Sequence, residues 1–462
     1  MNGPFRVPRR LRPPWRRQPD PTAELATPEL GGVAAPSTEV ATRRSETFRA
    51  LRHRNYRLFF TGQGISLSGT WMQTIAQAWL VLELTDSKTA LGTVTVLQFL
   101  PITIFVLFAG VIADRVPKRN FILATQALAM VQALLLTALV WTGEIQLWHV
   151  YILAGMLGLA NAFEQPTRQA FVVEMVGKDD LMNAIALNSG LFNGARLVGP
   201  AVGGVIIATA GLKIAFLLNG LSFLPVIAGL LMMDLKLLHL GDRKASGPVN
   251  PLGELREGLS YALKTPATLL IIILIATLGT FGYNFIVVLP LVARYVLEGG
   301  SQQLGFLTAA VGLGALASAL ALASRKAATK FTLFLGGISF AALLGAVALS
   351  HWFYVTLLLL LLLGVANTAF AATANTSLQL ATPDYLRGRV MALWMLMAVG
   401  STPIGAFLTG FMADHLGVQT AIGVNAAACS VGVGAGLLYY VSHRKEVERT
   451  AIVAHEVRGV AT

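Results

Sequence analysis

Charged residues are scarce in this sequence. Only 13% of the 462 residues are charged, whereas 55% are apolar and the mean hydropathy is +0.65. A soluble domain carries about 25% charged residues, so this composition excludes a water-soluble globular protein and indicates a chain that lies in lipid. Hydrocarbon is roughly 30 Å thick, and each spanning helix therefore needs about 20 mainly apolar residues.

Cysteine is almost absent. Cys429 is the only one, which excludes an intrachain disulfide and a thiolate metal site. The seven histidines are scattered and form no metal-binding or catalytic pattern. The Gly-x-x-x-x-Gly-Lys-Ser/Thr motif that an ATP-driven pump would carry does not occur. We therefore expect no cofactor, no metal and no enzyme activity.

Long apolar stretches recur along the chain. They predict an all-α polytopic membrane protein with twelve transmembrane helices at 58–82, 90–112, 121–141, 148–170, 184–208, 214–233, 267–292, 304–323, 331–349, 353–374, 390–412 and 418–441.

Polar segments divide these spans into two six-helix bundles, 58–233 and 267–441. The connector 234–266 carries Leu252, Leu255 and Leu259 at helical spacing, which predicts a short amphipathic helix. Residues 1–57 form a basic, Pro-rich tail that we expect to be disordered, and residues 442–462 form a second tail.

The net charge of +12 is explained by where the basic residues lie in this topology. Basic residues gather in the two tails and in alternate loops, which places both termini in the cytoplasm. Membrane orientation therefore explains the charge, and no nucleic-acid partner is expected. Glu83, Asp86 and Asp414, near the outer ends of their spans, are interpreted as loop charges.

The two halves resemble each other at one constant offset of 206 positions. The matched pairs are Gly158 and Gly364, Asn161 and Asn367, Gly204 and Gly410, Gly211 and Gly417, and Asn219 and Asn425. With six spans in each half, corresponding helices keep the same direction, so the bundles are related by an axis along the membrane normal.

The loop between spans two and three carries a recognisable pattern. Its residues are Gly110, Asp114, Arg115, Lys118 and Arg119. The pattern closely resembles the signature Gly-x-x-x-Asp-Arg-x-x-Lys/Arg-Arg of the major facilitator superfamily. That resemblance implies that the Asp114 carboxylate holds an inward gate against the start of span eleven, where this chain has Arg387 and Arg389.

Span five carries Arg196, Gly199, Pro200, Gly203 and Gly204. Glycines at this spacing flatten one helix face for close packing, and a proline bends the span. The Gly-Pro-x-x-Gly-Gly core resembles the antiporter motif of exporting facilitators, although the residue before Arg196 is Ala where the fullest form has Gly.

The resemblance covers roughly residues 48–441. The stretch 161–171 resembles the exporter branch that includes the enterobactin exporter and bacterial macrolide efflux proteins. This resemblance implies a monomeric secondary transporter in the bacterial inner (plasma) membrane.

Arg196 lies near the predicted membrane midplane, where an unpaired charge costs at least a few kcal/mol. Glu164 on the preceding span is the nearest carboxylate in depth. The two residues could form a structural ion pair. Alternatively, Glu164 exchanges protons while Arg196 tunes its pKa, or Arg196 attracts an anionic group of the substrate.

Other polar side chains on the spans are possible residues of a substrate cavity: Gln63, Gln73, Gln77, Asn161, Gln165, Tyr283, Asn284 and Asn367. Hydrogen bonding between helices is the alternative role for each.

Together these features predict a secondary transporter, a proton-coupled exporter of amphipathic small molecules such as drugs or siderophores. Its partners would be the small-molecule substrate, protons and the lipid bilayer. An importer of a small metabolite and a non-transporting membrane receptor are the alternatives.

Overall fold

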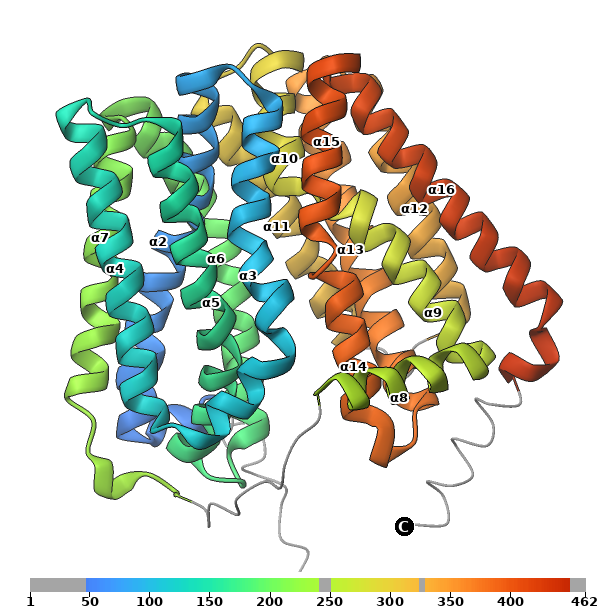
Figure 1. The fold of residues 1–462 in the computed structure, drawn as a ribbon, viewed down its shortest axis with the longest axis horizontal. Helices are drawn as coiled ribbons and strands as arrows, with labels where there is room; N and C mark the ends of the chain where they lie inside the picture. Colours follow the sequence, from blue (N-terminus) through green and yellow to red (C-terminus); the bar gives the residue numbers. More distant parts are fainter. Residues whose placement is uncertain (1–46, 241–250, 324–328, 449–462) are drawn as a thin grey trace, which may run out of the picture. The chain divides into compact units, whose positions relative to one another are not determined.

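The computed structural model describes residues 47–240, 251–323 and 329–448, and the described chain is helical (Figure 1). The first half contains six long helices: α2 (Arg54–Thr85), α3 (Lys88–Arg115), α4 (Lys118–Thr142), α5 (Leu147–Val176), α6 (Leu181–Ala210) and α7 (Leu212–Leu231). Two short 3-10 turns, η1 (Arg49–Arg52) and η2 (Leu235–Leu237), flank them.

The second half supplies six further crossing segments, two of them divided. The seventh consists of α9 (Pro266–Thr277), the π-helical η3 (Leu278–Gly282), α10 (Phe285–Leu291) and the π-helical η4 (Val292–Val296). The others are α11 (Ser301–Ala323), α12 (Lys330–Leu349), α13 (Phe353–Ala381), α14 (Asp384–Ala398) with α15 (Thr402–Leu416), and α16 (Val418–Ser442). The twelve predicted spans thus correspond to twelve crossing segments of the described chain.

Length and hydropathy alone pick out ten of these segments in the described residues. The two that fall below that threshold are α2 and α5, although they are 32 and 30 residues long. Both carry buried polar side chains, Gln63 and Gln73 on α2 and Glu164 on α5. Their polar residues face the protein interior, so a low mean hydropathy does not exclude them from the membrane.

The seventh and eleventh spans are broken where continuous helices were predicted. Between η3 and α10, the side chain of Asn284 donates to the carbonyl of Thr280 at 2.7 Å and so replaces a backbone donor. Between α14 and α15, Pro403 has no N–H to continue the ladder, and the hydroxyl of Thr103 donates to the carbonyl of Gly400 at 3.1 Å. Each break leaves backbone polar groups that neighbouring side chains satisfy.

The prediction of a disordered tail up to residue 57 is wrong for its last part. η1 and the start of α2 are ordered because their side chains bind the ends of α6 and α7. Arg49 and His53 both pair with Asp180, with His53 Nε2 lying 2.7 Å from the carboxylate. The amide of Asn55 donates to the carbonyl of Asp234 at 2.7 Å. Residues 1–46 of the predicted tail lie outside the described residues.

The connector helix forms as predicted. α8 (Pro251–Lys264) is amphipathic and lies against the second half, next to α9 and α14. Glu257 pairs with Arg389 at 2.8 Å, and the hydroxyl of Tyr261 donates to the carbonyl of Ala381 at 2.9 Å. These contacts fasten α8 to the end of α13 and the beginning of α14.

The repeat is visible in matching contacts at glycines. Gly211 and Gly417 both adopt left-handed φ angles, +83° and +86°, and each directly precedes the last helix of its half. Gly158 packs on the backbone of α3 at Gln98, and Gly364 packs on that of α11 at Val311. The two halves are therefore pseudo-symmetric in packing as well as in sequence.

Candidate functional site

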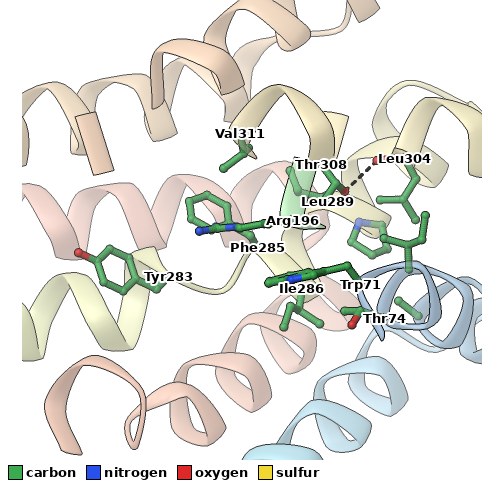
Figure 2. A pocket seen from close by; sticks show the side chains of 13 residues that line it. Trp71, Thr74, Arg196, Tyr283, Phe285, Ile286, Leu289, Leu304, Thr308 and Val311 are labelled. Carbon is green, nitrogen blue, oxygen red and sulfur yellow. Dashed lines mark hydrogen bonds between the residues drawn. The ribbon is translucent and has the colours of Figure 1, made fainter. Parts of the chain in front are cut away.

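A cavity of about 210 Å³ lies where the two halves meet. From the first half, α2 and α6 reach it, and from the second half α10 and α11 (Figure 2). The lining residues are Trp71, Thr74, Ile75, Ala78, Arg196, Tyr283, Phe285, Ile286, Leu289, Pro290, Leu304, Thr308 and Val311. Apolar and aromatic side chains dominate, as is typical of small-molecule sites.

Arg196 is the only charged residue among those lining side chains. Its guanidinium stacks over the Trp71 ring, 5.6 Å from the centroid, and the two side chains converge on the cavity in Figure 2. Within the part of the chain that the structure describes, no carboxylate pairs with it. Its backbone carbonyl lies close to Gly312 of α11, so this arginine sits directly at the contact between the halves.

Three further polar groups line the cavity. The hydroxyls of Thr74 and Thr308 donate to carbonyls of their own helices at 3.0 and 2.8 Å. The buried hydroxyl of Tyr283 has no hydrogen-bond partner among the described residues. The Tyr283 hydroxyl is enclosed within the second half, so the polar group left to bind a ligand in the cavity is the Arg196 guanidinium, which can donate.

The halves close tightly at the end where α2 ends and α3 begins, called here the Asp86 end. A Cβ at Gly204 of α6 would lie 2.7 Å from the carbonyl oxygen of Ser301 and 2.8 Å from the Cα of Gly305. The equivalent Gly410 of α15 meets the first turn of α3 in the same way, 2.5 Å from the carbonyl of Lys88. Two symmetry-related glycine contacts thus seal this end.

Ionic contacts join the halves at the same end. The Asp414 carboxylate of α15 accepts hydrogen bonds from the backbone N–H groups of Lys88 and Thr89 at 3.0 and 2.7 Å, at the positive end of α3. Asp86 accepts from Arg294 at 3.0 Å and from the hydroxyl of Tyr295 at 2.6 Å. The interpretation of Asp86 and Asp414 as ordinary loop charges is therefore wrong, because both bridge the two halves.

At the opposite end, where α8 lies and α2 begins, three described glycines make no such contact. A Cβ at Gly190 or Gly194 of α6, or at Gly388 of α14, would meet no atom within 4 Å. Among the described residues, the ion pairs that join the halves lie at the Asp86 end, and those near the α8 end stay within one half. Among the described side chains, the ion pairs and the Gly204 and Gly410 contacts that join the halves thus lie at the Asp86 end.

Glu164 is buried inside the first half. It accepts a hydrogen bond from the side chain of Gln126 at 2.9 Å, and Arg168 lies 3.8 Å away, one turn along α5. The predicted ion pair with Arg196 is therefore wrong for this structure, because nearer polar groups on α4 and α5 satisfy the carboxylate while Arg196 turns toward Trp71.

Most of the polar side chains predicted for the cavity lie elsewhere. Gln73 binds Gln132 and Asn219 at 2.9 and 2.5 Å, within the first half. The side chain of Gln77 lies 3.5 Å from that of Gln98, and Gln63 and Asn284 are buried. Asn161 is half-buried, Gln165 is exposed, and the amide oxygen of Asn367 is buried without a partner among the described residues. Of the predicted residues, Tyr283 lines the cavity.

The predicted gating residues are only partly described. The side chains of Gly110, Asp114 and Arg115 lie outside the described part of the structure. Lys118 pairs with Glu174 at 2.7 Å, and Arg119 donates to the carbonyl of Leu230 at 2.6 Å. In the second half, Arg387 pairs with Asp384 and Arg389 pairs with Glu257.

The antiporter-like motif packs α6 on both sides. Gly199 and Gly203 face α2 at Trp71 and Met72, whereas Gly204 and the carbonyl of Pro200 face α11 of the other half at Gly305. The motif thus sets the approach of the two halves beside the cavity.

Sequence reasoning missed most of the cavity wall. Trp71, Thr74, Ile75 and Ala78 follow helical spacing on α2, which is a usable signal for one shared face. Apolar residues on a membrane span face lipid or a neighbouring helix equally well, so this spacing alone could not place them at a cavity.

Comparison with known proteins agrees with this geometry. Residues 45–458 match the family model described as transmembrane secretion effector. The staphyloferrin A transporter of Staphylococcus aureus is 26% identical, over 78% of this chain and 90% of that protein. Macrolide efflux protein A of Streptococcus pyogenes is 25% identical, over 80% and 92%. A bacterial homologue of the human lysosomal transporter Spinster, solved in an inward-facing conformation, superposes with a TM-score of 0.65 at 12% identity, over 85% and 98%.

Proposed function

Because the chain belongs to the transmembrane secretion effector family of the major facilitator superfamily, we propose that it is a proton-coupled exporter of amphipathic small molecules working by alternating access. The family and the apolar helices make it a multi-pass membrane transporter. We place it in the bacterial plasma membrane, as a monomer with both termini in the cytoplasm.

One observation carries the proposal: a cavity between the halves, with the close glycine contacts and ion pairs that join the halves at the Asp86 end. The basic residues Lys118, Arg119 and Arg389 lie at the α8 end, which the positive-inside rule assigns to the cytoplasm. In that orientation this conformation accepts substrate from the cytoplasm. The name of the macrolide efflux relative supports export as the direction.

Glu164 is our choice for the proton-binding residue. It is a buried carboxylate whose described polar partners are Gln126 and, at 3.8 Å, Arg168. Protonation would remove its attraction for Arg168 and change the packing of α4 on α5. A proton could therefore bias the first half toward one of the two facing states without entering the cavity.

A proton-gradient assay tests both parts. Everted membrane vesicles are energised, and a pH-sensitive dye follows the gradient while amphiphiles and siderophores are added. The wild type is expected to release part of the gradient with a transported compound, and Glu164→Gln is expected to lose that response. Glu144→Gln, which makes the same change in an exposed loop, is expected to behave like the wild type.

Two results would count against the proposal. If wild-type vesicles accumulated a compound without releasing any of the proton gradient, proton coupling would be ruled out. A Glu164→Gln response equal to that of the wild type at every pH would remove Glu164 from the mechanism.

A further inference from the structure

The cavity between the halves holds a positive charge that no described side chain neutralises. Its lining contains Arg196 and no Asp or Glu. A cation held in a low-dielectric cavity is costly unless an anion pairs with it. Stacking on Trp71 offsets only part of that cost, because a cation–π contact is worth about 0.5–2 kcal/mol.

None of the lining hydroxyl groups pairs with this charge. The Tyr283 hydroxyl is buried without a described partner, whereas the Thr74 and Thr308 hydroxyls are already satisfied by backbone carbonyls. The Tyr283 hydroxyl is enclosed within the second half, where its ring packs on Phe340, so the Arg196 guanidinium is the donor that the cavity leaves without an acceptor. An oxyanion would supply both the charge and the lone pairs that the Arg196 guanidinium requires.

The other lining residues indicate the chemistry of the uncharged part of the ligand. Trp71 and Phe285 present aromatic surfaces from the two halves, and the remaining wall is largely aliphatic (Figure 2). Such a surface takes an apolar or aromatic body and leaves no site for a second charge.

From this arrangement we infer that the transported molecule is an amphiphile with a single anionic group, a carboxylate or similar oxyanion, which binds Arg196 while its aromatic or aliphatic body lies between Trp71 and Phe285. The inference rests on the proposed function, whose substrate it narrows. Arg196 belongs to α6 and packs at Gly312 of α11, so an anion bound there touches the contact that must change when the halves rock.

Direct binding tests the inference with two probes that differ only in charge. The full chain is placed in nanodiscs of zwitterionic phosphatidylcholine, and equilibrium dialysis measures the affinity for 2-naphthylacetate and for its neutral amide. The wild type is expected to bind the carboxylate at least about tenfold more tightly than the amide. Arg196→Gln is expected to abolish that preference, so that the two probes bind with equal affinity.

Two further variants keep the test sharp. Arg196→Lys keeps the charge and is expected to retain part of the preference. Lys213→Gln removes another cation that stacks on a tryptophan, Trp141 at 5.3 Å, but lies outside the cavity, so it is expected to retain the full preference. A melting temperature equal to that of the wild type shows that each variant is folded.

Equal wild-type affinity for the two probes, or an equal loss of both in Arg196→Gln, would overturn the inference. Adding anionic phosphatidylglycerol to the nanodiscs distinguishes the source of the anion. If that lipid displaces the carboxylate only when Arg196 is present, the site binds lipid headgroups and the inference of a transported solute fails. The binding assay needs no proton gradient, so its result is independent of the transport assay. Charge-selective binding without transport would refute only the proposed exporter function. Transport without charge-selective binding would refute only the inference of an anionic substrate.

Discussion

Asp180 links η1 and the start of α2 to the start of α6 through Arg49 and His53. The hydrogen bond with His53, and the one with Arg49, lower the pKa of the Asp180 carboxyl below its usual value. The folded-state pKa is thus below that of the unfolded chain, about 3.9. Its stabilising effect is fully present above that value and is lost as the pH falls through the folded-state pKa.

We therefore expect Asp180→Asn to lower the melting temperature by about 2 °C at pH 7. The difference from the wild type is expected to shrink as the pH falls below about 4. Thermal unfolding of the purified protein at several pH values measures this. Asn at the exposed neighbour Asp179 is the control, and a difference that grows on acidification would contradict the assignment.

Single residues also show which features of the candidate site could be predicted from the sequence. A charge predicted near the membrane midplane identified Arg196 as unusual, because burying a charge is costly whatever the fold. The sequence could not show that Glu164 does not pair with Arg196. The hydrogen bond that Glu164 accepts from Gln126 depends on how α4 packs on α5. Likewise Trp71 has no sequence feature that separates a cavity wall from a lipid-facing ring.

At the scale of helices, the glycines of α6 set how closely the halves approach. Gly204 contacts Gly305 backbone to backbone, so an added methyl group must push α6 and α11 apart at the Asp86 end. Overpacking of this kind costs about 1–3 kcal/mol. Because this contact lies at the Asp86 end, the cost falls mainly on the conformation that is closed there.

Gly204→Ala is accordingly expected to shift the population about tenfold or more toward a conformation open at the Asp86 end. Spin labels on the loops at that end would report longer distances between the halves. Gly423→Ala on α16, where a Cβ meets no atom within 4 Å, provides the comparison. Unchanged distances in Gly204→Ala would show that the contact does not control closure.

The helices themselves were largely predictable, because lipid imposes one length and one pattern on every span. The breaks at Asn284 and Gly400 were not. A proline or glycine in a span is compatible with either a bend or a break, and the choice depends on whether a neighbour such as Thr103 can satisfy the freed carbonyl.

Across the whole molecule, the Asp86 end is held by two carboxylates that cross between the halves in opposite directions. Asp414 of the second half binds the first turn of α3, and Asp86 of the first half binds Arg294 and Tyr295. Hydrogen bonds to a charged group contribute roughly 1.5–3 kcal/mol each. Both contacts must break before the cavity can open at this end.

Removing both charges is therefore expected to expose the cavity at the Asp86 end. In a Cys429→Ser background, Thr74→Cys places a thiol on the cavity wall, and a membrane-impermeant maleimide added at the Asp86 side measures its access. Asp86→Asn with Asp414→Asn is expected to raise the labelling rate at least about tenfold, because the population open at that end grows as the contacts weaken. Glu144→Gln in the same background is the charge control. If the double variant labelled no faster than this control, the glycine contacts at Gly204 and Gly410 alone would hold the end closed.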